Sequence, residues 1–158
     1  MPSISETAYP RYKSNFTQKE LNDIYTPTQN EIDFAINVTR GDTAKLCFIV
    51  MLKSYQRLGF FIPITEIPVQ IVQHVAETIG MPIIPDINNY DRSGTRPRHI
   101  QILRDYFKTK PFDKVARHIV SKAMREAAKT KEELADLINV AIEELTRNYY
   151  ELPSFNTL

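Results

Sequence analysis

The chain has 158 residues, of which 42% are hydrophobic and 25% charged, and its formal net charge is +1. These values are typical of one globular domain and exclude a disordered chain. The longest unbroken apolar run, residues 46–52, is far shorter than the roughly 20 residues that a membrane-spanning helix needs. Since the first residues also lack the apolar core of a signal peptide, we expect a cytoplasmic protein with no membrane partner.

Helical patterns run through the whole chain. Only four glycines occur, and apolar residues recur at helical rather than strand spacing. Thr17 and Glu20 have the spacing of a capping box, and Pro27 and Gly80 suit a helix start and a helix end. The sequence therefore predicts an all-α fold, a compact bundle of about seven helices. In chain order these helices cover residues 18–25, 27–39, 43–58, 69–79, 97–107, 111–130 and 131–150.

One predicted helix is apolar almost all round. Between Leu46 and Leu52 residues 43–58 have no polar face, so we expect the other helices to surround this one. It contains the only cysteine, Cys47, which excludes an internal disulfide. An apolar setting predicts a buried, inert thiol.

We expect a helical domain over residues 16–148, preceded by an extended arm at 1–15. Residues 149–158 have the composition of a linker, which favours a fragment of a larger protein. Within the domain, the helices at 69–79 and 97–107 could form a helix-turn-helix-like unit. Their connection is much longer than the usual turn of 3 to 4 residues.

The small net charge conceals a strongly basic middle. Residues 92–125 carry ten Lys or Arg against two acids, a net of +8. Residues 1–91 have a net charge of −3, and residues 126–158 a net charge of −4. Such asymmetry is typical of a surface that binds a polyanion.

The segment SGTRPRHIQILRDYF predicts a helix with cations in its first turn. Helix N-termini favour anions and disfavour cations, so this arrangement indicates that a negative group such as phosphate binds there. The polar residues between the core positions are expected to face solvent: Arg98, His99, Gln101 and Asp105. The residues at core spacing are Ile100, Leu103 and Phe107.

A second basic row is predicted on the following helix, opposite its apolar stripe. The two rows are neighbours in sequence and could line one duplex. The alternatives are a solvated face or, for the arginines at 92, 96 and 98, pairing with Glu132 and Glu133. The residues of the second row are Lys114, His118, Ser121, Lys122 and Arg125.

Catalytic signatures are missing from the sequence. No phosphate-binding loop, dinucleotide fingerprint, zinc-protease motif or nucleophile elbow occurs. His74 and His118 lack partners at metal-ligand spacing, so we expect structural roles for them and no metal site. We therefore expect no enzymatic activity and no cofactor in this chain.

The order of the segments RGDTAKLCFIVMLKSYQRLGFFIPITEIP and YDRSGTRPRHIQILRDYFKTKPF resembles a known family. It is similar to the N-terminal DNA-binding region, of the DUF4158 type, of Tn-3 family replicative transposases, and the similarity covers nearly the whole chain. The resemblance implies a module that recognises the terminal inverted repeats of a transposon. The acidic-triad catalytic domain, with its Mg²⁺, would lie in an absent downstream part.

This resemblance implies duplex DNA and the rest of the transposase as partners, a possible homodimer in the full-length protein, and nucleoid association when DNA is bound. The alternative is a helical protein-interaction or dimerisation scaffold with only non-specific DNA affinity. The primary DNA contacts that it implies are Arg92, Ser93, Thr95, Arg96, Arg98, His99 and Gln101. The supporting phosphate contacts are Arg40, Lys45, Lys114, Lys122 and Arg125.

Overall fold

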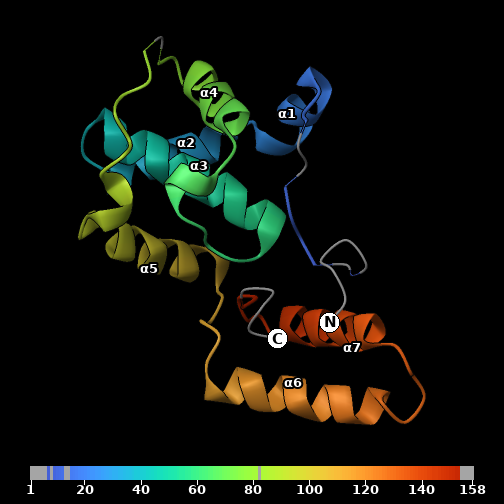
Figure 1. The fold of residues 1–158 in the computed structure, drawn as a ribbon. Helices are drawn as coiled ribbons and strands as arrows, with labels where there is room; N and C mark the ends of the chain where they lie inside the picture. The colour runs from blue at the N-terminus through green and yellow to red at the C-terminus, as the bar shows by residue number, and fades with distance from the viewer. Residues whose placement is uncertain (1–6, 8, 13–14, 82, 154–158) are drawn as a thin grey trace. The chain divides into compact units, whose positions relative to one another are not determined.

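The computed structural model describes residues 7, 9–12, 15–81 and 83–153, and its secondary structure is all-α, as the sequence predicts (Figure 1). No β-strand forms within these ranges, where one isolated bridge joins Lys110 to Tyr150. Parts of the predicted arm and linker, at 1–6, 8, 13–14 and 154–158, lie outside the described residues. The α-helices are α1 (Gln18–Tyr25), α2 (Gln29–Val38), α3 (Asp42–Leu58), α4 (Val69–Thr78), α5 (Thr95–Phe107), α6 (Lys114–Ala127) and α7 (Leu134–Arg147).

The first two helices begin at side-chain caps, whereas the third begins at a glycine turn. Thr17 accepts a hydrogen bond from the backbone N–H of Glu20 at 3.1 Å, which confirms the predicted N-cap of α1. α2 follows Thr28, which forms a reciprocal capping box with Glu31. α3 follows Gly41, whose φ of 87° lies in the region that favours glycine. A backbone turn, rather than a side-chain cap, therefore starts α3.

The contacts divide the chain into two compact units. One unit, Tyr12–Leu103, contains α1 to α4 and the start of α5, and we call it the α3 unit. The other, Met1–Arg11 with Arg104–Leu158, contains α6 and α7, and we call it the hairpin unit.

The core of the α3 unit is α3, which α1, α2 and α4 contact. Every residue from Leu46 to Tyr55 is buried, which confirms the prediction of a central helix. Cys47 has no exposed surface, and burial raises the pKa of its thiol to about 12. The thiol is therefore protonated at neutral pH, as expected for an inert buried cysteine.

A buried polar network joins α2 to α3. Glu31 accepts hydrogen bonds from Lys53 Nζ at 3.2 Å, from Gln56 Nε2 at 2.8 Å and from the backbone N–H of Thr28 at 2.8 Å. Burial alone would raise the pKa of Glu31, but these three donors lower it below its ordinary value. The charges of Glu31 and Lys53 are thus compensated inside the unit, and they fix α2 on α3.

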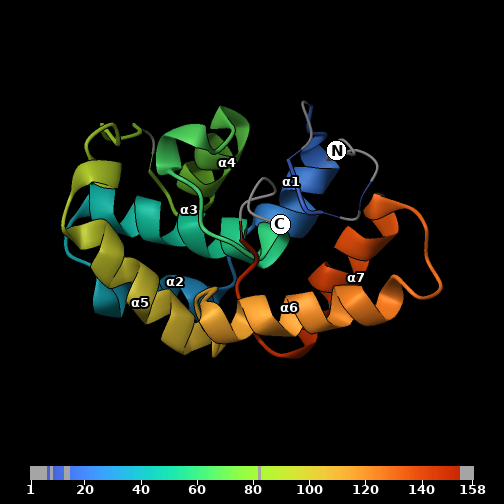
Figure 2. The same ribbon diagram turned by 60° about the horizontal axis from the view of Figure 1, so that its bottom comes forward.

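The helix-turn-helix-like pairing considered for α4 and α5 is wrong. α4 packs against α3 and α1, whereas α5 begins on the opposite side of α3, as both views show (Figures 1 and 2). The connection of residues 79–94 is long enough to pass from one side of α3 to the other. It ends in a 3-10 turn, η3 (Tyr90–Arg92), directly before α5.

In the hairpin unit, α6 and α7 pack side by side (Figure 2). Residues 149–153, at the start of the segment expected to be a linker, are held beside the chain that follows α5. The backbone N–H of Lys110 donates to the Tyr149 carbonyl at 2.9 Å, and that of Glu151 donates to the Lys110 carbonyl at 2.8 Å. The guanidinium of Arg104 donates to the buried Glu151 carboxylate at 2.7 and 3.4 Å.

Candidate nucleic-acid interface

The predicted primary contacts cluster at the start of α5, in the α3 unit. η3 ends at Arg92, and α5 begins three residues later at Thr95, so the end of the turn and the first two turns of the helix carry the whole set. The structure sorts these residues by exposure. The exposed ones are Arg92, Arg98 and Gln101; the half-buried ones are Ser93, Thr95 and Arg96; His99 is buried.

Asp91 organises the approach to α5. Its carboxylate accepts hydrogen bonds from the backbone N–H groups of Ile64 at 2.7 Å and Thr65 at 3.2 Å, which start the 3-10 turn η2 (Ile64–Glu66). It also lies 3.4 Å from Nε of Arg96. Arg96 Nε is buried and makes no aligned hydrogen bond, so charge alone draws it to Asp91. Arg96 is consequently held within the α3 unit, and the partner of this arginine is an acid that the sequence analysis did not assign to it.

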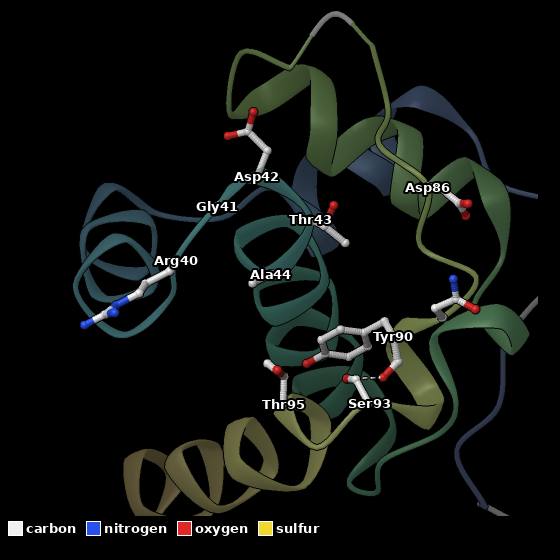
Figure 3. Close-up of a pocket in the computed structure, with 10 residues that line it drawn as sticks. Arg40, Gly41, Asp42, Thr43, Ala44, Asp86, Tyr90, Ser93 and Thr95 are labelled. Carbon is white, nitrogen blue, oxygen red and sulfur yellow. Dashed lines mark hydrogen bonds between the residues drawn. The ribbon is translucent and has the colours of Figure 1, made fainter.

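Ser93 and Thr95 line a hollow of about 420 Å³ between the N-terminal ends of α3 and α5 (Figure 3). The hydroxyl of Ser93 donates to the Tyr90 carbonyl at 2.6 Å, so this side chain shapes the turn before α5. The exposed Arg40 stands at the rim with its side chain pointing away from Thr95. The hollow also has two acids at its rim, Asp42 and Asp86, which disfavour a phosphate inside it.

His99 is a core residue, and the expectation that it faces solvent is wrong. It lies four residues before Leu103 and is therefore on the same, apolar side of α5. Only 1% of the surface of His99 is exposed. Its ring packs edge-on against Phe48, with 5.2 Å between centroids, and its Nδ1 lies 2.7 Å from the Tyr90 hydroxyl. Burial, followed by the charge of Arg98, lowers the pKa of His99 to about 4.

Arg92 and Arg98 are exposed and make no ion pair with any acid of the described residues. Both stand at the N-terminal end of α5, where the helix dipole disfavours positive charge. Because Arg96 is held by Asp91 and His99 is neutral at pH 7, these two arginines supply the accessible charge of this surface. We call the two arginines, together with Gln101, the α5 surface.

The supporting residues lie in both units. Lys45, on α3, is mostly covered and lies 3.9 Å from Asp42. In the hairpin unit, Lys114, Lys122 and Arg125 are exposed on α6, opposite the buried Ala116 and Val120. Two exposed neighbours extend this row: His118, and Arg117, whose guanidinium lies over the Phe112 ring at 5.4 Å.

The predicted second basic row did not include Arg117, although it lies three residues after Lys114 and so nearly on the same side of α6. We call Lys114, Arg117, His118, Lys122 and Arg125 the α6 row.

Among the described residues, no group of three or more His, Cys, Asp or Glu side chains could hold a metal ion. His74 is buried and shares a 2.8 Å hydrogen bond with the Thr26 hydroxyl. Among the described helices none has the length and apolar character needed to cross a bilayer.

Comparison with known proteins gives one match. A family model described as a domain of unknown function (DUF4158) matches residues 1–158, which is the whole chain. No curated protein and no solved structure matches the chain.

Proposed function

The chain belongs to the DUF4158 family, and we propose that it binds duplex DNA as the N-terminal recognition module of a DNA transposase, at the terminal inverted repeats of its element. The observation that supports the proposal most is the exposure of Arg92 and Arg98 at the N-terminal end of α5. The N-terminal end of a helix favours anions, and two accessible cations stand at this one. A bound phosphate would be stabilised by both the helix end and the two arginines.

The residues of the α5 surface have different chemistry to offer DNA. An arginine can bind a phosphate, or it can donate two hydrogen bonds to guanine in the major groove. Gln101 lies three residues after Arg98 and can pair with adenine in the same way. We assign backbone contact to Arg92 and base reading to Arg98 and Gln101. His99 is excluded from the contacts because it is buried, and Arg96 contributes by holding Asp91 and η2 beside the helix.

We expect no strand cleavage by this chain. The expectation rests on the sequence, which contains no phosphate-binding loop, zinc-protease motif or nucleophile elbow. In this proposal, the Mg²⁺-dependent steps belong to other parts of the transposase.

Selection from a pool of randomised duplexes, followed by fluorescence anisotropy on the selected sequence, tests the proposal. Arg98→Ala is expected to reduce the preference for the selected over a shuffled duplex by 1–3 kcal/mol, or about 5- to 150-fold, because one good base contact is worth roughly that much. Arg147→Ala, which removes a 71% exposed arginine of α7, is the matched control and should leave the preference unchanged. Equal preference in the parent and in Arg98→Ala would contradict the assignment of the α5 surface.

A second candidate function is supported by the charged sides of the hairpin unit. The α6 row is basic, and acids dominate the exposed side of α7, so two copies could associate through them. Exposed ion pairs contribute roughly 0.2–1 kcal/mol each, and four of them would give at most about 4 kcal/mol. That corresponds to a dissociation constant of about 1 mM. Duplex DNA, with one charge per roughly 1.7 Å, is the stronger partner for such a row.

A further inference from the structure

The hairpin unit separates its charges by side. From Lys114 to Arg125 the chain contains no Asp or Glu, and from Glu132 to Thr146 it contains no Lys or Arg. The exposed acids of the second segment, which we call the α7 row, are Glu132, Glu133, Asp136 and Glu143. The α6 row, from Lys114 to Arg125, covers about 16 Å of helix at a rise of roughly 1.5 Å per residue.

The two rows cannot neutralise each other within the unit. α6 buries Ala116 and Val120 on the side opposite the α6 row. α7 buries Ile138, Ala141 and Leu145 on the side opposite Asp136 and Glu143, and Glu132 and Glu133 lie in the connection just before α7. The described ion pairs that involve residues of α6 and α7 are local instead: Lys129 with Glu126 at 3.1 Å, and Arg147 with Glu144 at 3.0 Å. The α6 row therefore presents its charge uncompensated.

We propose that the α6–α7 hairpin binds the phosphate backbone of duplex DNA in one orientation, with the α6 row against the phosphates and the α7 row turned away. This inference rests on the proposed function and specifies how the hairpin unit takes part in it. A row of four Lys and Arg side chains releases counterions from the duplex and gives attraction that is independent of sequence. In the reversed orientation the four acids of the α7 row would face the phosphates, and like charges brought together at an interface are costly.

The chain suits a direct test of orientation because its single cysteine is buried, with a pKa of about 12, and is therefore protected from thiol reagents. Ser121 and Asp136 are exposed, one beside the α6 row and one in the α7 row. An iron–EDTA chelate attached to Ser121→Cys or Asp136→Cys cuts nearby DNA strands when peroxide and ascorbate are added. Parent protein treated with the same reagent measures any labelling of Cys47.

We expect cleavage of the bound duplex from position 121 to exceed that from position 136 by at least tenfold. Equal cleavage from both positions, or stronger cleavage from position 136, would overturn the proposed orientation. Both labelled proteins must bind with the affinity of the parent. If they do so without the expected asymmetry, the orientation is wrong while the proposed function stands, whereas a parent that binds no duplex removes both.

Salt dependence provides a second, independent test. Changing Lys114, Arg117, Lys122 and Arg125 together to Gln should reduce the slope of log affinity against log salt by roughly 3 to 4, since each phosphate contact contributes about 0.9. The matched control changes Lys19, Lys129, Lys131 and Arg147 to Gln, which removes the same charge elsewhere on exposed positions. An unchanged slope in the first variant, or equal reductions in both, would contradict a contact through the α6 row.

Discussion

The hydroxyl of Tyr90 lies 2.7 Å from Nδ1 of His99, and both side chains are buried. This hydrogen bond joins the turn before α5 to the helix itself, and the ring of Phe48 on α3 packs edge-on against the imidazole. The start of α5 is thus fixed on α3 from the inside. Arg98, on the adjacent position, is consequently directed to the surface on a rigid element.

The buried His99 makes stability depend on pH. Its pKa is about 4 in the folded protein, against 6.5 ordinarily, so between these values the unfolded chain binds more protons. The contribution of His99 is complete above about pH 6.5 and is lost as the pH falls toward 4. The loss amounts to about 3 kcal/mol at roughly 1.36 kcal/mol per pKa unit. Urea unfolding of the parent across this range should show the decline.

His99→Asn tests the source of that decline, because asparagine can still share a hydrogen bond with Tyr90. We expect lower stability at pH 7 but a flatter profile between pH 6.5 and pH 4. Some slope should remain, since burial also lowers the pKa of His74. His118→Asn is the matched control on an exposed position. A variant profile as steep as that of the parent would assign the decline to other groups.

Lys53→Met should destabilise the α3 unit strongly. It leaves the carboxylate of Glu31 buried with its charge partner removed, and breaking a buried ion pair in this way costs about 3–5 kcal/mol. Lys19→Met removes the same type of side chain from an exposed pair with Asp23 and should cost about 0.5 kcal/mol or less. The free energy of unfolding in urea measures both. Similar small losses would mean that water or Gln56 compensates Glu31 fully.

Asp91→Ala should loosen the segment before α5. It removes the acceptor for the N–H groups of Ile64 and Thr65 and the ionic partner of Arg96, with an expected cost of about 1–3 kcal/mol. Asp136→Ala, on an exposed position of α7, is the control and should stay within about 0.5 kcal/mol of the parent. If thermal unfolding shows the same stability for Asp91→Ala and Asp136→Ala, Asp91 does not organise this segment.

Arg104 and Glu151 should show coupling in a double-mutant cycle. Their side chains are 27% and 9% exposed, and the guanidinium makes two hydrogen bonds to the carboxylate. Charge-assisted bonds in this setting are worth about 1.5–3 kcal/mol, and we expect about 1–2 kcal/mol of coupling after solvent screening of the arginine. The cycle for Arg147 and Glu144, whose arginine is 71% exposed, provides the comparison. Additive losses for Arg104→Ala and Glu151→Ala would contradict the interaction.

Most of the fold could be predicted from the sequence because local chemistry decides it. The cap at Thr17 and the unbroken apolar stretch around Cys47 place α1 and the central α3 correctly. Contacts between residues far apart in the chain were harder to predict from the sequence. His99 was placed on the surface because imidazole is polar, yet a buried partner, Tyr90, satisfies it. The same limit applies to Asp91, whose bonds to Ile64 and Thr65 join segments 26 residues or more apart.

The central claim is binding of duplex DNA, and one measurement tests it most directly. Fluorescence anisotropy of the protein is recorded with a duplex that carries the terminal inverted repeat of its source element and with a shuffled duplex, over a series of salt concentrations. We predict a preference for the repeat of about 10³-fold or more, together with a steep loss of affinity as salt increases. Equal and weak binding to both duplexes would contradict the account.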